Sequence, residues 1–333
     1  MNLAIVGATG VVGREFIKII EQRDFVYDSL RLFSSARSAG SSMTVKGKDY
    51  IVEELTEDSG AEIDIALFSA GGGTSKRFAP IFADKGALVI DNSSAWRMEP
   101  DVPLVVPEVN PADAVLHKGI IANPNCSTIQ AVVALKPLQD SYGLKRVVYS
   151  TYQSVSGAGA AGIRDLEQGI LGNSPTNFKY PIAGNLIPQI DSFLENGYTK
   201  EEVKMVNETR KIMGLPNLRV TATTVRVPVV SAHSISINVE LERTFDLPDV
   251  FRALREAKGI IVQDDPSAGV YPMPITAAGR DEVFVGRIRR DESVENGLNI
   301  WCVADNIRKG AALNAVQIAE LIKNQRSITL NAV

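Results

Sequence analysis

The sequence predicts an α/β fold of two domains, the first built on a parallel sheet and the second on a mixed sheet. Three observations lead to this prediction. The chain has 333 residues, more than the roughly 250 to 300 at which single hydrophobic cores stop growing. Before about residue 125, short apolar runs alternate with helical patterns. After it, the strand-like runs are longer and alternate in polarity, which favours a mixed or antiparallel sheet.

The expected first domain begins with a strand at residues 2–7, a glycine-rich turn and a helix. The apolar face of this helix carries Val12, Phe16, Ile19 and Ile20. Further strand-like runs stand at 29–33, 63–68, 87–91, 104–106 and 120–122. Helical or turn-rich stretches separate these runs, which predicts a parallel sheet with helices on both faces.

The expected second domain carries strands at 147–154, 220–230, 233–241 and 283–290. Proline, glycine and asparagine cluster between residues 171 and 188, which predicts a loop that is either plain surface or an oligomer contact. Residues 308–323 are amphipathic, so we expect a helix that packs on a core.

Composition narrows the class of protein. A net charge of −4 and a pI near 5.5 give no basic face for nucleic acid, and no apolar run is long enough for a membrane span. No leader pattern precedes the first strand, so we expect a cytoplasmic enzyme whose partners are small molecules. With two cysteines and two histidines, neither a disulfide scaffold nor a metal site is expected.

Three glycines, Gly7, Gly10 and Gly13, lie between the first strand and the first helix. In that context a glycine pattern lets a dinucleotide pyrophosphate approach the helix N-terminus, although the spacing here is GxxGxxG, and a bare turn is the alternative. After the second strand, residues 34–40 carry hydroxyls and Arg37 where an NAD enzyme has an acid. These groups suit a 2′-phosphate and favour NADP; a polar loop with a solvated Arg37 is the alternative.

The segment at 123–128 precedes a good apolar helix, which puts Cys126 at a helix N-terminus. The helix dipole and free amides there favour a thiolate and can stabilise an oxyanion, which predicts a nucleophile over a buried filler residue. Cys302, within an apolar strand, is expected in the core.

Two further polar residues lie in strand-like surroundings. Burying Arg226 would be costly without an anion, and a substrate carboxylate is one such anion. His233 lies seven positions later, an odd number that would put it on the opposite face of a continuous strand, so we expect a break between Val227 and Ala232. Alone, each would more often be a structural residue, and His117 reads as a surface turn residue.

Taken together, these segments resemble the aspartate-semialdehyde dehydrogenase family over nearly the whole chain. The segments that carry the resemblance are GATGVVG at 7–13, SSARSAG at 34–40, ALFSAGGGTS at 66–75, DNSSAWR at 91–97, VPLVVPEVN at 102–110, PNCSTIQ at 124–130, STYQSVSGAG at 150–159, EEVKMVNETRKIM at 201–213, VRVPVVSAHS at 225–234 and DNIRKGAALNAVQIAE at 305–320.

The resemblance implies a role for each matching residue. Cys126 would be the acylated nucleophile, Gln153 would orient the acyl group and His233 would be the general acid/base. Arg226 would bind the substrate α-carboxylate and Glu201 its amino group, with Glu202 as the alternative. The phosphate site would consist of Arg97, Ser94, Asn125 and Lys204. The NADP site would be lined by Gly7, Thr9, Gly10, Val11, Val12, Gly13, Ser35, Arg37, Ser38, Ser156, Gly157 and Asn306.

The implied reaction is reduction of L-aspartyl-4-phosphate by NADPH to L-aspartate 4-semialdehyde and phosphate, a step in lysine, threonine, methionine and diaminopimelate biosynthesis. The expected NADP-binding Rossmann-type domain comprises residues 1–125 and 305–333, and the catalytic and dimerisation domain residues 126–304. A homodimer or homotetramer is implied. Two alternatives remain. One is N-acetyl-γ-glutamyl-phosphate reductase, which needs no carboxylate such as Glu201. The other is a non-catalytic NADP sensor, which would be expected to lose Cys126, Gln153, Arg226 or His233, all of which are present.

Overall fold

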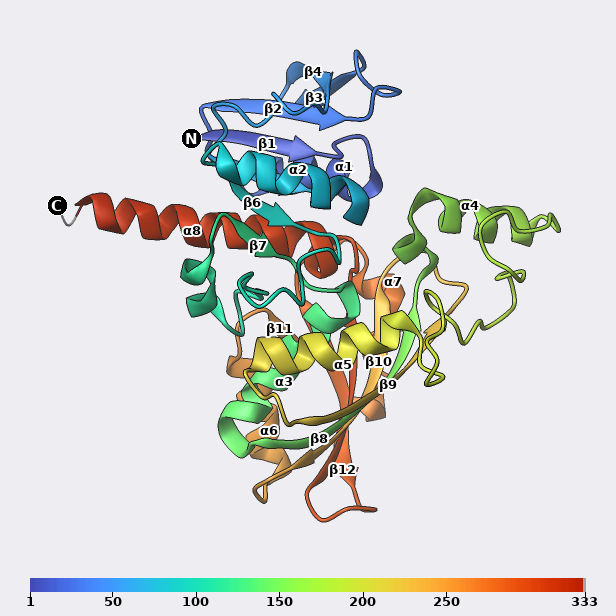
Figure 1. Cartoon of the computed structure of the whole chain (residues 1–333). Helices are drawn as coiled ribbons and strands as arrows, with labels where there is room; N and C mark the ends of the chain where they lie inside the picture. Colours follow the sequence, from blue (N-terminus) through green and yellow to red (C-terminus); the bar gives the residue numbers. More distant parts are fainter. Residues whose placement is uncertain (332–333) are drawn as a thin grey trace. The chain divides into compact units, whose positions relative to one another are not determined.

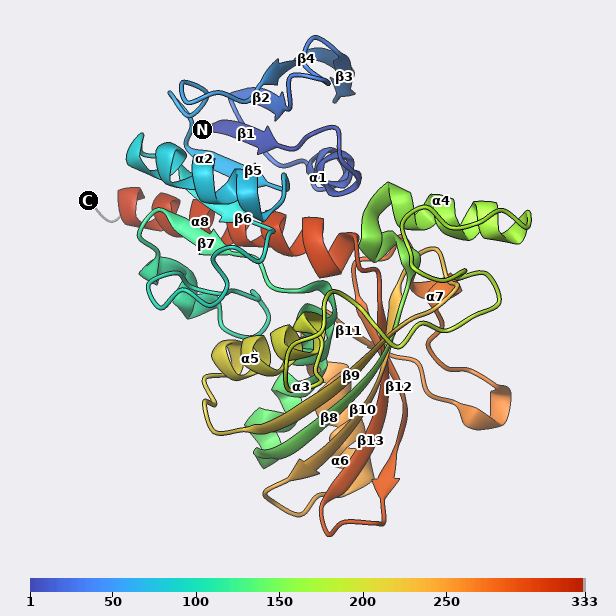
Figure 2. The same ribbon diagram turned by 45° about the vertical axis from the view of Figure 1, so that its right-hand side comes forward.

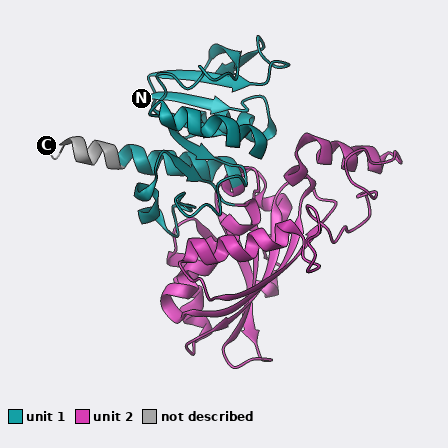
Figure 3. Cartoon of the chain, viewed as in Figure 1, with its two compact units in different colours: residues 1–124, 311–333 teal, residues 125–310 magenta. Residues whose placement is uncertain are grey.

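The computed structural model describes residues 1–331, with side chains described through residue 324 (Figure 1). Contacts divide the chain into two units (Figure 3). Unit 1 comprises residues 1–124 and the chain from residue 311 onward, and unit 2 comprises residues 125–310. The second boundary follows Gly310, whereas the sequence-based boundary precedes Asp305. Among the described residues, no helix could span a bilayer; the cytoplasmic location stays a prediction.

Unit 1 is built on a seven-stranded sheet in the order β3-β4-β2-β1-β5-β6-β7. Its strands are β1 (Asn2–Val6), β2 (Ser29–Ser34), β3 (Ser42–Val45), β4 (Lys48–Glu54), β5 (Ile65–Phe68), β6 (Leu88–Asp91) and β7 (Ile120–Ala122). All neighbours pair in parallel except β3 and β4, which form an antiparallel hairpin. The predicted parallel sheet is therefore confirmed, and the hairpin is an addition that the sequence analysis missed.

One expected strand of unit 1 is wrong. Residues 104–106 make a single isolated bridge, between Leu104 and Ala122, and no strand. Pro103 and Pro107 flank this short run, and neither can donate a ladder hydrogen bond.

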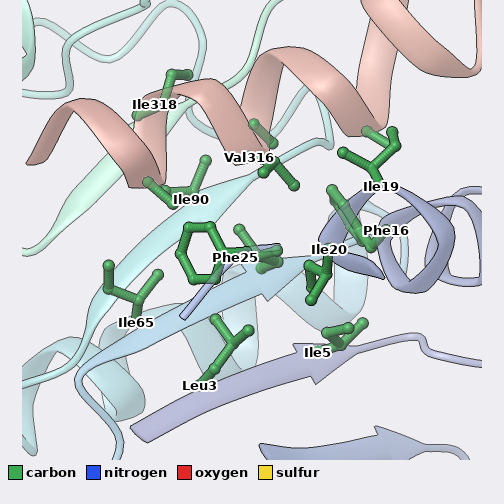
Figure 4. Close-up of a cluster of buried hydrophobic side chains, with 14 of the residues drawn as sticks. Leu3, Ile5, Phe16, Ile19, Ile20, Phe25, Ile65, Ile90, Val316 and Ile318 are labelled. Carbon is green, nitrogen blue, oxygen red and sulfur yellow. The ribbon is translucent and has the colours of Figure 1, made fainter. Parts of the chain in front are cut away.

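Helices cover both faces of the unit 1 sheet. The helices are α1 (Val11–Gln22), α2 (Gly72–Asp84) and α8 (Leu313–Asn331), with a 3₁₀ turn, η1, at Pro111–Leu116. Helices α1 and α8 share a buried cluster with the sheet, in which Phe16 and Val316 lie near Ile5 and Ile90 (Figure 4). On α2, Phe82 packs edge-on against Phe68. The C-terminal helix therefore completes the core of the N-terminal unit, and the expected core-packing helix is confirmed.

Unit 2 is built on a six-stranded mixed sheet in the order β11-β12-β13-β10-β8-β9. Its strands are β8 (Leu144–Gln153), β9 (Arg219–Arg226), β10 (His233–Leu241), β11 (Ile260–Val262), β12 (Val283–Asp291) and β13 (Gly297–Ala304). The two outer pairs, β11 with β12 and β8 with β9, are parallel and the others antiparallel. This arrangement confirms the predicted mixed sheet.

Helices pack on one face of this sheet (Figure 2). They are α3 (Cys126–Tyr142), α5 (Lys200–Met213) and α6 (Leu247–Glu256). Side chains on that face, such as Tyr149 and Ile237, are fully buried. On the opposite face Tyr152 is 39% exposed and its ring lies 5.5 Å from that of Trp301. The two faces therefore differ, one forming a core and the other presenting aromatic and polar groups.

The predicted break between Arg226 and His233 is present. Strand β9 ends at Arg226, short of the expected residue 230, and β10 begins at His233. Between them Ala232 has a φ of 70°, in the left-handed region that alanine seldom adopts. Strand β8 lies between β9 and β10 in the sheet, so Arg226 and His233 stand on different strands. Arg226 ends β9 and His233 begins β10, and both lie at the end of the sheet where β8 finishes.

The segment at residues 171–188 is irregular, as expected, and is anchored to the helix α4 (Gly159–Ile170). The buried carboxylate of Asp165 accepts hydrogen bonds from the backbone of Thr176, Asn177 and Phe178 at 2.7 to 2.9 Å. At its far end, Ile187 exchanges two backbone hydrogen bonds with Arg226. This loop therefore supports the end of β9, where a predicted site residue stands.

Candidate active site

Unit 1 contains a cavity of about 480 Å³ at the carboxyl ends of β1, β2 and β5. The cavity is lined by the glycine turn, by residues at the ends of β2, β4 and β5, and by residues of α2. The lining residues are Val6, Gly7, Thr9, Gly10, Ser34, Ser35, Ala36, Glu54, Leu55, Ser69, Ala70, Thr74, Arg77 and Phe78. In open parallel sheets, ligands bind at this edge, where the strand order reverses. Strand β1 lies at that reversal, with β2 on one side and β5 on the other.

The glycine turn is shaped by close backbone contacts. A Cβ on Gly7, whose φ is 85°, would lie 2.3 Å from the carbonyl oxygen of Ser69. A Cβ on Gly13 would lie 2.2 Å from the carbonyl oxygen of Gly7, whereas one on Gly10 would lie 3.3 Å from that atom. Gly7 and Gly13 are thus required for packing, while Gly10 is exposed at the N-cap of α1. A turn that served only to connect the strand and the helix would not need the main chain to come so close at both Gly7 and Gly13.

The predicted cofactor residues of unit 1 divide into two groups. Gly7, Thr9, Gly10 and Ser35 line the cavity, and the Thr9 hydroxyl lies 2.9 Å from that of Ser34. The remaining ones, Val11, Val12, Gly13, Arg37 and Ser38, are not among the lining residues, and Arg37 is exposed.

Sequence reasoning missed several lining residues, including one guanidinium, Arg77, and one carboxylate, Glu54. Arg77 pairs with Glu57 at 3.0 Å. The sequence signal for Arg77 was its place after the expected strand at 63–68, since parallel strands end at a common edge, whereas Glu54 ends β4, a strand that was not predicted.

Arg97 and Ser94, predicted to hold phosphate, follow β6 in unit 1. The buried guanidinium of Arg97 donates to the carbonyl oxygens of Asn123 at 2.9 Å and Asn92 at 3.0 Å. Ser94 is exposed. Arg97 also opposes the rise in the pKa of Asp91, which is caused mainly by burial.

In unit 2, Cys126 is the first residue of α3, so its predicted position at a helix N-terminus is confirmed. The Asn125 side chain caps the helix by accepting from the amides of Ser127 at 3.0 Å and Thr128 at 3.2 Å. The backbone amide of Asn125 donates to the buried carboxylate of Glu208 at 2.6 Å. The start of α3, which carries the thiol, is therefore fixed by its own cap and by α5.

The Cβ of Cys126 lies close to the main chain at Gly310. A Cβ on Gly310 would lie 2.9 Å from the Cβ of Cys126. Cys302, by contrast, is fully buried in β13, where burial raises the pKa of its thiol to about 12. Its predicted place in the core is confirmed, and of the two thiols only that of Cys126 has access to solvent.

The first turn of α5 gives Glu201 and Glu202 different hydrogen-bond partners. Both oxygens of Glu202 accept backbone hydrogen bonds, from Thr199 at 2.7 Å and Thr224 at 3.0 Å, so this residue serves as a helix cap. Glu201 instead accepts from the side chains of Asn125 at 2.8 Å and Gln153 at 3.3 Å. Glu201 therefore belongs to the side-chain cluster around the start of α3.

Lys204 extends this cluster at its exposed margin. Its ammonium lies 3.3 Å from Glu201 and 2.9 Å from Asp191. Two of the four predicted phosphate residues, Asn125 and Lys204, therefore contact the same carboxylate, that of Glu201.

Arg226 and His233 meet beside Gly157. A Cβ on Gly157 would lie 2.8 Å from Nη1 of Arg226 and 3.3 Å from Nε2 of His233. Arg226 donates from Nη1 to the carbonyl oxygen of Ser154 at 2.8 Å. Within the described part of the chain, Nε of Arg226 and Nε2 of His233 are buried without hydrogen-bond partners. Two buried polar atoms that need partners thus lie next to a position without a side chain, an arrangement suited to a polar ligand.

The electrostatics of these groups follow from burial. Burial lowers the pKa of Arg226, opposed by the charges of Glu201 and Cys126. Burial and the nearby Arg226 charge lower the pKa of His233 well below its usual 6.5, opposed by the backbone of Ala232. A cation beside Cys126 favours its thiolate, as does the N-terminus of α3.

Ser156 and Asn306, predicted at the cofactor, are buried in unit 2 and bonded to each other. The Asn306 amide donates to the Ser156 hydroxyl at 3.0 Å. The Asn306 carbonyl oxygen accepts from the Ala232 amide at 3.0 Å. Asn306 thus fixes the strained residue that precedes His233. Among the described residues, no group of three His, Cys, Asp or Glu side chains could hold a metal ion.

Two family models match the chain. Residues 2–117 match the model described as "Semialdehyde dehydrogenase, NAD binding domain", and residues 135–309 match "Semialdehyde dehydrogenase, dimerisation domain". The first match covers β1 to β6 of unit 1, and the second covers all six strands of unit 2.

Individual proteins resemble the chain over nearly its full length. An aspartate-semialdehyde dehydrogenase of Aquifex aeolicus is 59% identical over 331 residues, which cover 96% of this chain and 97% of the relative. The crystal structure of aspartate semialdehyde dehydrogenase II from Vibrio cholerae, complexed with ASA, has 47% identity and a TM-score of 0.94, covering 97% of this chain and 98% of that one. The Candida albicans enzyme, solved with NADP, has 26% identity and a TM-score of 0.75, covering 97% and 98%.

Proposed function

This chain belongs to the aspartate-semialdehyde dehydrogenase family and is an oxidoreductase, and we propose that it reduces L-aspartyl-4-phosphate through a thioester at Cys126. The observation that carries this proposal is the position of Cys126, at the capped start of α3. A thiol held there with a nearby guanidinium is ready to attack a carbonyl carbon.

The cofactor is NADP, which is also the dinucleotide in the Candida albicans structure. The residues of unit 1 fit such a group, because two glycines clear the backbone at the start of α1 and a cavity of about 480 Å³ adjoins them. The bound dinucleotide supplies the hydride. We assign cofactor binding to unit 1, and catalysis and dimerisation to unit 2.

In the proposed reaction, the thiolate of Cys126 adds to the acyl carbon of the substrate and phosphate leaves. A thioester on Cys126 is then reduced, and the thiolate departs as the aldehyde forms. The positive end of the α3 dipole favours the negative oxygen that appears in both additions. Gln153 lies at the end of β8, paired in register with Arg226, and we assign it to orienting the acyl group.

The charged side chains around Cys126 are complementary to the charged groups of an amino acid that carries an acyl phosphate. We assign Arg226 to the α-carboxylate, since its buried guanidinium has an Nε without a partner among the described residues. We assign Glu201 to the α-ammonium, since Glu202 is committed to capping α5. Arg97, Ser94, Asn125 and Lys204 are assigned to the phosphate.

One assay tests the function and its nearest alternative together. The purified protein should reduce NADP in a phosphate-dependent manner with L-aspartate 4-semialdehyde, and far more slowly with N-acetylglutamate semialdehyde. A preference for the acetylated substrate would favour the reductase alternative, because an acetamide has no charge for Glu201 to bind. No turnover with either substrate, together with retained NADP binding, would favour a sensor.

For assembly, we propose a homodimer that pairs the open face of the unit 2 sheet, consistent with the matched dimerisation domain. That face presents Tyr152 and Trp301 beside a cavity of about 320 Å³. Charge in the centre of such an interface is costly, so Tyr152→Arg should shift the sedimentation equilibrium toward monomer. An unchanged dimer would place the interface elsewhere.

A further inference from the structure

The ammonium of Lys204 lies between two carboxylates. It is 2.9 Å from Oδ2 of Asp191 and 3.3 Å from Oε2 of Glu201. Glu201 has a part in the proposed reaction, because it is assigned to the α-ammonium of the substrate. Asp191 belongs to the segment that precedes α5 and has no part in that reaction. The closer of the two partners of Lys204 is therefore a carboxylate that the chemistry does not use.

The main chain holds the Asp191 carboxylate in a defined position. Asp191 has a φ of 68°, in the left-handed region that few residues other than glycine, asparagine and aspartate adopt. Its Oδ1 accepts from the Ser192 amide at 2.8 Å, and its Oδ2 accepts from Lys204. The Ser192 carbonyl oxygen accepts from the amide of Lys200, the first residue of α5, at 2.9 Å. The carboxylate is thus fixed relative to the helix that carries Lys204.

Asp191 is ionised at neutral pH. Burial opposes ionisation, but the hydrogen bonds from Lys204 and from the Ser192 amide lower the pKa of Asp191 below its usual value. Lys204 therefore shares its positive charge between two negative side chains. A phosphate group is also negatively charged at neutral pH, so a phosphate that approaches Lys204 meets Asp191 as a like charge and as a competing acceptor.

The two carboxylates differ in how easily they can be exchanged for another anion. The Glu201 side chain is 7% exposed and also accepts from Asn125 and Gln153. The Asp191 side chain is 37% exposed. Ion pairs that are open to solvent are weak, and an ammonium can turn its donors toward a new acceptor. The contact of Lys204 with Asp191 is therefore the one that a phosphate would displace.

We propose that Asp191 competes with the substrate phosphate for the ammonium of Lys204 and so weakens phosphate binding at the active site. The inference rests on the proposed function, which assigns Lys204 to the phosphate. Asp191 acts through Lys204 and does not touch the reacting atoms. When phosphate binds, Lys204 exchanges Asp191 for a phosphate oxygen. When phosphate leaves after the thioester has formed, Asp191 takes the ammonium back, which favours release of the product.

Removing the competing charge should strengthen phosphate binding. Asp191→Asn keeps the size of the side chain, an acceptor for the Ser192 amide and a residue type that tolerates a positive φ. In the phosphate-dependent reduction of NADP with L-aspartate 4-semialdehyde, KM for phosphate should fall about two- to fivefold, as expected for a partly exposed ion pair. The difference from wild type should shrink as salt is added, because the effect is electrostatic. An unchanged or higher KM for phosphate would overturn the proposal.

Two further variants separate the charge from the backbone. Asp191→Gly should also lower KM for phosphate, because glycine adopts a positive φ without strain and carries no charge. Asp24→Asn is the matched control, since Asp24 has a φ of 47° and pairs with Lys46 at 3.5 Å in unit 1. This control should keep the wild-type KM for phosphate. An equal fall in the control would mean that net charge, and not Lys204, sets the affinity, which would overturn the proposal.

Phosphate binding can also be measured without turnover. Cys126 directly follows Asn125, which is assigned to the phosphate with Lys204, so inorganic phosphate should slow the alkylation of Cys126 by iodoacetamide. The phosphate concentration that halves the alkylation rate should be about two- to fivefold lower in Asp191→Asn. In a Lys204→Met background, Asp191→Asn should have no effect. A gain that persists without Lys204, or no protection in any of these proteins, would overturn the proposal.

The assay and the alkylation experiment fail independently. A wild-type protein without phosphate-dependent turnover, in which Asp191→Asn nevertheless strengthens protection by phosphate, would refute the proposed function and support the competition at Lys204. An active wild-type enzyme in which Asp191→Asn changes neither KM for phosphate nor the protection would support the proposed function and refute the competition.

Discussion

The cavity of unit 1 and the cluster around Cys126 in unit 2 are built in different ways. In unit 1 the backbone sets the shape: Gly7 and Gly13 leave no room for a Cβ, and their contacts are with nearby carbonyl oxygens. In unit 2 side chains set the shape: Asn125, Glu201 and Gln153 are joined by hydrogen bonds between α3, α5 and β8. The first region depends on main-chain approaches, one of them from Ser69 after β5, whereas the second depends on side chains from three different elements.

Substitutions in the two regions should therefore affect different properties of the protein. In unit 1 the sensitive positions are those where an added carbon meets the main chain, so stability should change before chemistry does. In unit 2 the sensitive positions are functional groups held at a distance from one another, so chemistry should change before stability does.

The two thiols give the sharpest test within unit 2. Cys126→Ser should lower turnover at least about a thousandfold, because loss of a nucleophile removes the covalent route, while NADP binding should survive. Cys302→Ser should keep turnover and lower the free energy of unfolding, because it places a hydroxyl in a fully buried strand. Turnover of the first variant within tenfold of wild type would exclude Cys126 as nucleophile.

The two histidines provide the next test. His233→Ala should lower kcat by about 10²- to 10⁴-fold, since Nε2 of its ring is buried and lies next to the open position at Gly157. His117→Ala is the matched control, because His117 lies at the end of η1 in unit 1 and accepts from the Gly119 amide. Steady-state kinetics measure both. Comparable losses of kcat in the two variants would show that the loss in His233→Ala does not arise from a role in the active site.

Two glycines three residues apart test the steric account of unit 1. Gly13→Ala should lower the free energy of unfolding by about 1 to 3 kcal/mol, because its Cβ would overlap the Gly7 carbonyl oxygen. Gly10→Ala should change it by less than about 0.5 kcal/mol, because Gly10 is exposed. Urea unfolding without NADP provides the measurement. Equal destabilisation by both substitutions would mean that the close contact of Gly13 with the Gly7 carbonyl oxygen is not the reason that glycine is needed.

Two arginines test the cofactor assignment. Arg37→Ala should weaken NADP binding about 10- to 100-fold with little effect on NAD, the loss expected for one charge-assisted contact to the 2′-phosphate. Arg77→Ala is the matched variant, because Arg77 lines the cavity whereas Arg37 does not. Titration calorimetry with both dinucleotides decides between them. An NADP-specific loss in Arg77→Ala alone would transfer the role to that residue.

The smallest effect concerns pH. The pKa of His233 is lower in the folded chain than in the unfolded chain, so the unfolded state takes up a proton first as the pH falls. The stability associated with a neutral ring is therefore present above about pH 6.5 and is lost below it, by up to about 1.4 kcal/mol per pH unit. The unfolding free energy of His233→Gln should lack this part of the slope between pH 6.5 and 5. Identical slopes in both proteins would mean that the buried ring is not neutral.

Features that depend on near neighbours along the chain could be predicted from the sequence. The succession of strand, glycine turn and helix at residues 2–22 and the helix start at Cys126 follow from short patterns, because backbone conformation and capping are set within a few residues. The hairpin of β3 and β4 was missed, since its strands are short and largely exposed and lack a clear apolar alternation.

The way in which the side chains of unit 2 meet depends on contacts between distant parts of the chain. The break between β9 and β10 could be inferred from the odd spacing, but the common edge reached by Arg226 and His233 depends on β8 lying between their strands. Likewise, Ser154 and His233 are 79 residues apart, and Asn306 is 152 residues from Ser154. Hydrogen bonds over such separations form only after the sheet has brought the strands together, so no local pattern in the sequence can specify them.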